Sequence, residues 1–211
     1  MAAMNTSKIS LDKRQGPPYS SRIKTYLPIN QRDLNPSASL QEDDENVNMM
    51  DLKVAFRQDI RPSDRATVRK LVEATGFFSG DETAIAVELV EERLARGDAS
   101  GYHFLFAEAG GEAIGYACYG PVPATLCSYD IYWMAVHPDF QRRGLGRELL
   151  GRTEVLIREQ GGRQIYMDTS GRAQYEPTRL LYEGRGYRQA AYLPDYYAPG
   201  DAKVIYEKFM V

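Results

Sequence analysis

Residues 134–150 constrain the fold and the chemistry of this chain more than any other stretch. They read MAVHPDFQRRGLGRELL, in which an apolar run from Tyr129 to Val136 is followed by a polar turn. The turn passes through Gly144 and Gly146 into a helical pattern, and glycine lets a backbone approach a bulky anion because it has no Cβ. The first turn of a helix offers unpaired N–H groups and a positive dipole end. The stretch therefore predicts a strand–turn–helix unit that cradles a phosphate or pyrophosphate.

Two other phosphate-binding motifs do not fit this turn. The dinucleotide-binding fingerprint requires a third glycine where this chain has Leu149, and a P-loop would end in Gly-Lys-Ser/Thr. The alternative interpretation is that Gly144 and Gly146 only shape a tight turn. Three arginines in and beside the turn favour an anionic ligand: Arg142, Arg143 and Arg147.

This stretch resembles the pyrophosphate-binding loop of the GNAT superfamily of N-acetyltransferases, a Gln/Arg-x-x-Gly-x-Gly/Ala motif. The resemblance implies that acetyl-CoA is a co-substrate and that backbone N–H groups at Met134–Val136 hydrogen-bond to its acetyl carbonyl. The implied cofactor-binding residues are Met134, Ala135, Val136, Gln141, Arg142, Arg143, Gly144, Leu145, Gly146 and Arg147.

Regular strand and helix patterns begin at Asp51. Their order is β, α, α, β, β, β, α, β, α, β, β, which is the order expected of the acetyltransferase fold. We therefore expect an α/β domain over residues 51–211, with a central, mostly antiparallel, twisted mixed sheet flanked by helices. The expected elements include strand Leu52–Arg57, helix Arg65–Thr75, a helix opened by Ser79 and stopped by Gly97, hairpin strands Tyr102–Glu108 and Glu112–Gly120, strand Tyr129–Val136, helix Gly144–Gln160, strand Gln164–Thr169, helix Glu176–Glu183, a strand from Gly186, and strand Val204–Met210.

A second motif places a tyrosine in the chemistry. Residues 181–187, LYEGRGY, resemble the family's Leu-Tyr-x-x-x-Gly-Phe signature, which implies that the Tyr182 hydroxyl protonates the departing thiolate. A phenol with a pKa near ~10 carries a proton at neutral pH. The alternative is that Tyr182 is a core aromatic beside Leu180 and Leu181.

One part of the family pattern is missing. An asparagine that often precedes this helix and contacts the pantetheine arm has no counterpart in residues 169–175, which read TSGRAQY. Gln174 or Ser170 could take its place.

The base that deprotonates the acceptor amine is not fixed by any motif, so several carboxylates remain candidates. Asp130 lies on the strand that leads to the turn, Asp168 lies at the end of the next strand, and Glu108 is a third candidate. Each could instead be an exposed charge or an arginine's partner. Strict alternation along the strand would place Met134 and Val136 on the same face as Asp130 and Tyr132.

The segment Tyr192–Asp201 is rich in tyrosines, acids and turn formers and is expected as a loop between the last two strands. Tyrosines and carboxylates suit a cationic amine through cation–π and ionic contacts. The segment could therefore shape an acceptor pocket, or it could be an ordinary packed surface loop.

Composition excludes several other classes. A net charge of −3 argues against nucleic-acid binding, and no apolar run approaches the ~20 residues of a membrane helix. The only histidines, His103 and His137, exclude a histidine-rich metal site, and no metal is expected. Cys118 and Cys127 are expected to be reduced packing residues of a cytoplasmic protein, which could form a homodimer.

Residues 1–50 differ from the rest of the chain. They contain few apolar residues and four prolines, Pro17, Pro18, Pro28 and Pro36, so a disordered extension is expected. Met49 or Met50 is an alternative start, and the extension could also dock the chain on a partner protein.

The sequence thus predicts an acetyl-CoA-dependent N-acetyltransferase that transfers the acetyl group directly to a primary amine on a small molecule or peptide. Its catalytic candidates are Tyr182, Asp130 and Asp168, and Gln174 joins the cofactor-binding set. The alternative is a non-catalytic acyl-CoA-binding or sensing module, which would keep the loop but would not need Tyr182.

Overall fold

The computed structural model describes residues 53–210, so the predicted extension over residues 1–50 lies outside the described residues. The order of strands and longer helices is the predicted one. The elements are β1 (Ala55–Arg57), α1 (Asp64–Thr75), α2 (Gly80–Arg96), η2 (Gly97–Ser100), β2 (His103–Ala109), β3 (Glu112–Pro121), β4 (Ser128–Val136), η3 (Pro138–Phe140), α3 (Leu145–Glu159), β5 (Gln164–Ser170), η4 (Ala173–Tyr175), α4 (Glu176–Gly184), β6 (Arg188–Ala198) and β7 (Asp201–Phe209).

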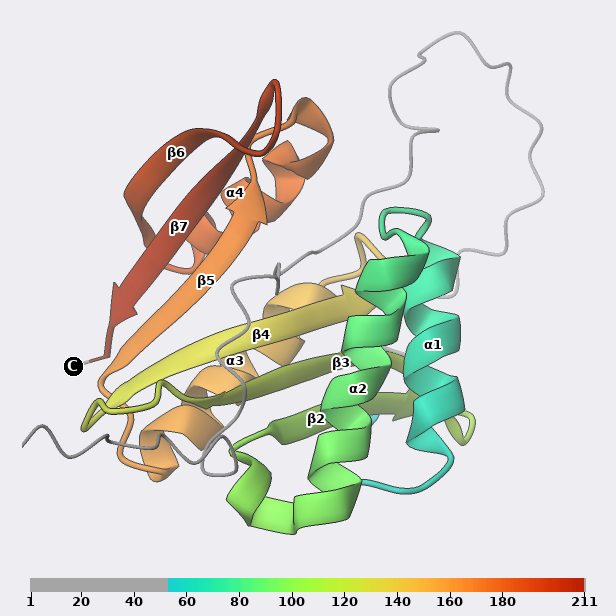
Figure 1. Ribbon diagram of the computed structural model, residues 1–211. Coiled ribbons are helices and arrows are strands. Elements are labelled where there is room, and N and C mark those ends of the chain that lie inside the picture. The colour runs from blue at the N-terminus through green and yellow to red at the C-terminus, as the bar shows by residue number, and fades with distance from the viewer. Residues whose placement is uncertain (1–52, 211) are drawn as a thin grey trace, which may run out of the picture.

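The strands form one mixed sheet of seven with the order β1-β2-β3-β4-β5-β7-β6. Every neighbouring pair is antiparallel except β4 and β5, which are parallel. Helices α1 and α2 cover one face of the sheet, and α3 and α4 lie on the other (Figure 1). Each face has its own apolar core, so the sheet is the middle layer of three.

Local sequence signals fix the helix ends. Ser79 and Glu82 form a reciprocal capping box that begins α2, and Gly76, with φ 69°, ends α1 in the left-handed region. Ser63 stands at the N-cap of α1 without a side-chain cap. The Asp64 carboxylate instead accepts a hydrogen bond from the Arg61 N–H and pairs with Arg57.

The two parts of the sheet separate between β4 and β5. Their parallel pairing joins Ser128–Asp130 to Gln164–Tyr166 and then stops. Beyond this point the strands diverge (Figure 1), and among the described residues the strand that pairs with residues 133–136 of β4 is β3. The opposite edge of residues 133–136 faces no described strand.

A β-bulge interrupts β4 directly after the paired segment. Tyr119 of β3 pairs with Ile131, and the preceding residue Cys118 pairs with Trp133, which leaves Tyr132 as the extra residue. An inserted residue reverses the side-chain alternation of the strand beyond it.

The bulge overturns the predicted shared face of β4. Asp130 and Tyr132 lie on the side of α1 and α2, whereas Met134 and Val136 belong to the core on the side of α3. The prediction that all four share one face is therefore wrong, because strict alternation does not continue through a bulge.

The segment predicted as a loop between the last strands is mostly strand. β6 continues to Ala198 and β7 begins at Asp201, so only residues 199–200 form the turn. Pro194 is tolerated because β6 is an edge strand. Asp195 has φ 53°, and its carboxylate accepts a hydrogen bond of 2.7 Å from the Gly200 N–H, which closes the irregular end of the hairpin.

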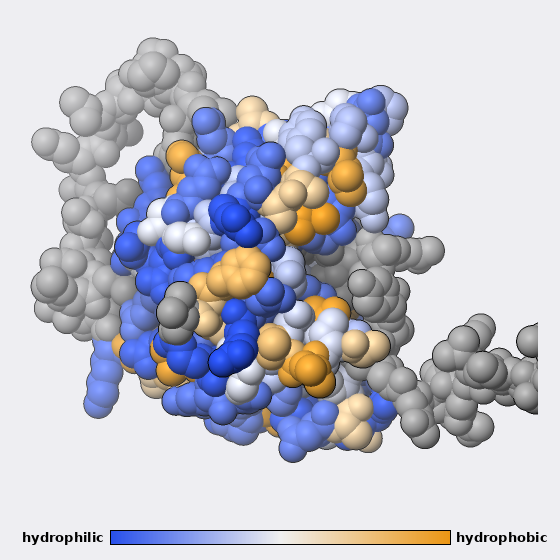
Figure 2. Space-filling view, turned by 90° about the vertical axis from the view of Figure 1, so that its left-hand side faces the viewer, coloured by the Kyte–Doolittle hydropathy of each residue, from blue (hydrophilic) through white to orange (hydrophobic). Residues whose placement is uncertain are grey.

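Hydrophilic residues dominate the molecular face shown in Figure 2, where apolar residues form only small patches. None of the helices over residues 53–210 has the length and apolarity to cross a membrane. Cys118 and Cys127 are free cysteines, and Cys118 is buried in the core.

Candidate active site

The turn between β4 and α3 adopts the conformation that its glycine permits. Gly144 has φ 86° at the N-cap of α3, a left-handed value that L side chains rarely adopt, and Arg142 has φ 58°. The first helical hydrogen bond runs from the Glu148 N–H to the Gly144 carbonyl at 3.0 Å. The N–H groups of residues 145–147 therefore have no acceptor within the helix and can receive an anion.

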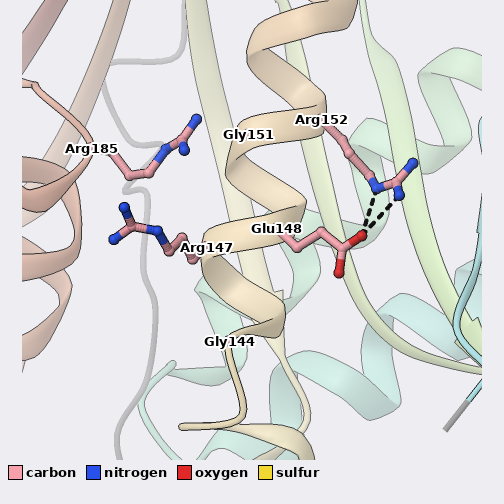
Figure 3. Close-up of a pocket in the computed structure, with 6 residues that line it drawn as sticks. All are labelled: Gly144, Arg147, Glu148, Gly151, Arg152 and Arg185. Atoms are coloured by element: carbon pink, nitrogen blue, oxygen red, sulfur yellow. Dashed lines mark hydrogen bonds and ion pairs between the residues drawn. The ribbon is translucent and has the colours of Figure 1, made fainter. Parts of the chain in front are cut away.

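Basic side chains extend this turn into a groove along α3. The groove has a volume of about 460 Å³ and is lined by Gly144, Arg147, Glu148, Gly151, Arg152 and Arg185. Arg147 and Arg185 project into the space between α3 and the end of α4, whereas Glu148 and Arg152 pair on the other flank of the helix (Figure 3). The flank nearest α4 is therefore positively charged.

Gly151 gives Arg185 its place in the groove. A Cβ at residue 151 would stand 3.0 Å from Nη2 of Arg185, so glycine lets the guanidinium lie closer to α3 than a larger residue would. There it pairs with Glu154, which also pairs with Lys208 at 3.0 Å. Two cations thus share one buried carboxylate, which leaves a net positive charge on this group of three side chains.

The open edge of β4 presents backbone donors beside the turn. The His137 N–H donates to the Ile114 carbonyl of β3, so residue 137 faces β3 and Val136 faces the open side. Because backbone groups alternate along a strand, the Met134 N–H faces the same side. The Val136 carbonyl on this edge accepts a hydrogen bond of 2.9 Å from the side-chain amide of Gln141, which ties the turn to the strand.

Tyr182 reaches the same region from α4. Its side chain is fully buried in the core that contains Met134 and Val136, and its ring packs edge-on against Tyr206 with a centroid distance of 5.5 Å. Burial raises the pKa of Tyr182 well above its usual value, and the charge of Asp168 raises it further. The phenol therefore keeps its proton through the neutral range.

Two of the predicted carboxylates lie near the point where the strands diverge. Burial raises the pKa of Asp130 to about 7; Asp168 adds to this shift and Lys203 opposes it. Burial also raises the pKa of Asp168, but the Lys203 ammonium forms an ion pair with that carboxylate and opposes the shift directly. Asp130 is the carboxylate whose proton affinity suits exchange at neutral pH.

Comparison with known proteins decides the family. A GNAT-family protein from Desulfovibrio desulfuricans has 48% identical residues, and its structure superposes with a TM-score of 0.73 over 74% of this chain and 99% of that one. The chain belongs to the GNAT family of acetyltransferases. The sequence pattern of the GNAT acetyltransferase domain matches residues 100–189.

More distant structures share the GNAT fold. The ribosomal-protein-S18-alanine N-acetyltransferase of Escherichia coli is 20% identical, with a TM-score of 0.61 over 75% of this chain and 96% of that one. An acetyltransferase from Salmonella typhimurium, solved with its cofactor acetyl-CoA, is 19% identical, with a TM-score of 0.60 over 75% of this chain and 95% of that one. No match to the chain is found among curated proteins.

Two of the weaker candidates for the GNAT site have other contacts. Glu108 of β2 accepts a hydrogen bond of 2.7 Å from Arg57, and β3 separates its strand from β4. Ser170 is buried and donates to Asp201, which fixes the turn after β5. Gln174, in η4, is half-buried and is the remaining candidate to replace the family's asparagine.

The end of β6 lies close to Asp168 and Asp201. Tyr196 and Tyr197 stack edge-on at 5.0 Å, and Lys203 Nζ lies 5.1 Å from the Tyr196 ring centroid. Burial raises the pKa of Tyr197, and the charges of Asp168 and Asp201 raise it further. Tyr196 and Tyr197 of the predicted acceptor segment therefore lie near Asp168 and Lys203.

The connection between α1 and α2 contributes further aromatic rings on the same side of the sheet. The ring centroids of Phe78 and Trp133 of β4 are 4.9 Å apart, and those of Phe77 and Tyr175 of η4 are 5.7 Å apart. This connection thus bridges β4 and the segment after β5.

The sequence did not single out Lys203 or Arg185. Lys203 has no motif, and it meets Asp168 only through the pairing of β5 with β7. Arg185 stands inside the second motif, at a position that the family leaves variable. Gly151 interrupts an otherwise good helix, but nothing in the sequence connects it with Arg185.

Proposed function

We propose that this GNAT protein transfers the acetyl group of acetyl-CoA directly to a primary amine. The observation that carries the proposal is the left-handed Gly144 turn, which opens α3 beside residues 133–136 of β4, whose far edge faces no described strand. A Cβ at Gly144 would meet nothing within 4 Å, so the glycine serves the backbone conformation and leaves the space in front of it clear. A pyrophosphate with a long flexible arm fits a site built from these two features.

The chain's own groups supply the contacts for acetyl-CoA. The N–H groups of residues 145–147 and the side chains of Arg142, Arg143 and Arg147 would hold the pyrophosphate, and Arg185 adds charge to the groove beside it. Gln174 would contact the pantetheine arm. The Met134 and Val136 N–H groups would donate to the acetyl oxygen as negative charge develops on it.

The proposed reaction needs one base and one acid. The cationic amine first gives a proton to Asp130 or Asp168, and its freed lone pair then attacks the thioester carbon. The carbon–sulfur bond breaks, and the remaining extra proton on nitrogen leaves to solvent. Tyr182 then gives its hydroxyl proton to the departing thiolate. The raised pKa of Tyr182 means that its hydroxyl is protonated at every neutral pH, which a general acid requires, but it also makes the hydroxyl a weak acid.

The acceptor is proposed only as a class. Carboxylates and tyrosines at the end of β6 favour a cationic primary amine, on a small molecule or a peptide terminus. A net charge of −3 argues against nucleic acid as acceptor. A cytoplasmic location and a homodimer remain our expectations from the sequence.

A panel of primary amines tests the proposal. Full-length protein is mixed with acetyl-CoA and each amine, and release of the CoA thiol is followed. At least one amine should accelerate release, and Gly144→Asp should strongly reduce the acceleration at limiting acetyl-CoA. Tight binding of acetyl-CoA by calorimetry without amine-dependent release would instead identify a non-catalytic acyl-CoA-binding module.

A further inference from the structure

Asp130 and Asp168 occupy matching positions on adjacent strands. The side chains of Tyr129 and Ile131 point into the core on the side of α3, so Asp130 projects from the opposite face. Asp130 pairs in register with Tyr166, and Asp168 follows two residues later on that same opposite face. The two carboxylates thus lie on either side of the point where β4 and β5 diverge.

Lys203 is placed to reach only one of them directly. Lys203 lies on β7 and pairs in register with Ser170 of β5, so it is the diagonal neighbour of Asp168 on β5. Its ammonium pairs with the Asp168 carboxylate and also lies over the Tyr196 ring. Asp130 is one strand further away, because β5 separates β4 from β7.

The groups around Asp130 make the two carboxylates unequal. The cross-strand partner of Asp130 on β5 is Tyr166, whose hydroxyl donates to Gln164. The charge of Asp168 reaches Asp130 from β5 and that of Lys203 from β7, and the bulged Tyr132 follows on β4. Among the described residues, the charges that shift its pKa are those of Asp168, upward, and Lys203, downward. Two carboxylates with separated proton affinities can divide the roles of anion and proton acceptor.

We propose that Lys203 is a positioning residue that divides these roles: it keeps Asp168 as a resident anion and leaves Asp130 to accept the proton of the acceptor amine. This inference rests on the proposed acetyl transfer. It resolves which of the two candidate carboxylates is the base. Asp168 then attracts the cationic amine and supports the protonated form of Asp130 after transfer.

The test combines a pH profile with a titration that needs no catalysis. In Lys203→Met, Asp168 loses its cation and titrates together with Asp130, so the pair binds its first proton at a higher pH. With one fixed amine, the pH at which kcat/KM falls on the acid side of its pH profile should rise by about one pH unit. Carbon-13 NMR of labelled aspartate, with Asp130→Asn used for assignment, should show the same shift.

Matched variants separate this role from general damage. Lys203→Arg keeps the charge and should restore the wild-type profile. Arg188→Met removes another cation between β6 and β7, together with its 2.8 Å ion pair to Glu207, and should leave the profile unchanged. Asp168→Asn should lower the acid limb and raise the KM for the amine, whereas Asp130→Asn should reduce kcat by about 10²-fold or more.

Two results would overturn the proposal. One is an Asp130 titration within about 0.2 pH units of wild type in folded Lys203→Met. The other is loss of turnover in Asp168→Asn with turnover kept in Asp130→Asn, a comparison that serves even if Lys203→Met folds poorly. A protein without amine acetylation would contradict the proposed function instead, while the NMR titration would still report on Lys203.

Discussion

Asp168 lies two residues beyond the register partner of Asp130, on the same face of the adjacent strand, and has a lysine paired to it. This asymmetry gives two chemically identical side chains different proton affinities. The strands that carry them diverge at this point, which is also where the GNAT fold leaves the edge of β4 open. We propose that the carboxylates, the backbone donors and the Gly144 turn act in one site.

Asp130→Asn should stabilise the protein, and increasingly so as the pH rises. The pKa of Asp130 is about 7 in the folded chain and about 3.9 in an unfolded one. Between these values the folded state binds more protons, so the free energy of unfolding falls as pH increases. Relative to wild type, Asp130→Asn should gain about 2–4 °C in Tm at pH 8 and less at pH 5.

Glu112→Gln, which changes an exposed carboxylate on β3, is the control for this measurement. Its Tm difference from wild type should be the same at both pH values. An Asp130→Asn difference that is equally flat would show that Asp130 has no raised pKa.

Gly144→Asp should weaken acetyl-CoA binding at least tenfold, about 1.4 kcal/mol. Gly144→Asn is the matched control, because asparagine tolerates the left-handed region and has nearly the same shape without the charge. Calorimetry should show that Gly144→Asp binds acetyl-CoA clearly more weakly than Gly144→Asn does. Equal affinities for the two folded variants would mean that no phosphate lies against this turn.

Tyr182→Phe should lower kcat by about 10²-fold and change the KM for acetyl-CoA much less. The ring and its packing remain, so the Tm should move little. Tyr206→Phe removes a neighbouring core hydroxyl, which donates to Glu183 at 2.8 Å, and should keep its kcat. Single-turnover rates for Tyr182→Phe within about twofold of wild type would make Tyr182 a packing residue.

Arg185→Met should weaken acetyl-CoA binding by about threefold to tenfold and reduce its dependence on salt. Gly151→Leu should have a similar effect, because its side chain would occupy the place of the Arg185 guanidinium. Arg158→Met, at an exposed position on the same helix outside the groove, is the control. Unchanged affinity and salt dependence in both groove variants would exclude a role for Arg185.

The fold was predictable from the sequence because its signals are local. Gly144, Gly76 and the Ser79–Glu82 capping box each specify a backbone conformation within a few residues. The structure has the predicted order of strands and longer helices. The turn into α3 could likewise be placed from a single stretch of sequence.

The bulge and the ion pairs could not be predicted in this way. Beyond Tyr132, residues 133–136 are buried on both faces of the sheet, so no alternation of apolar and polar residues reveals the extra residue. Lys203 meets Asp168 across 35 positions of the chain, and only the pairing of β5 with β7 brings them together. Local patterns carry no information on such pairs.

The central claim is direct acetyl transfer to an amine. Its most direct test is a single-turnover experiment with acetyl-labelled acetyl-CoA and an amine from the panel, followed by mass spectrometry of the protein and the amine. We predict that the label passes from CoA to the amine at the rate of thiol release, with no acetylated protein on the way. Label that reaches the amine only through an acetylated protein, or thiol release unaffected by every amine, would contradict the account.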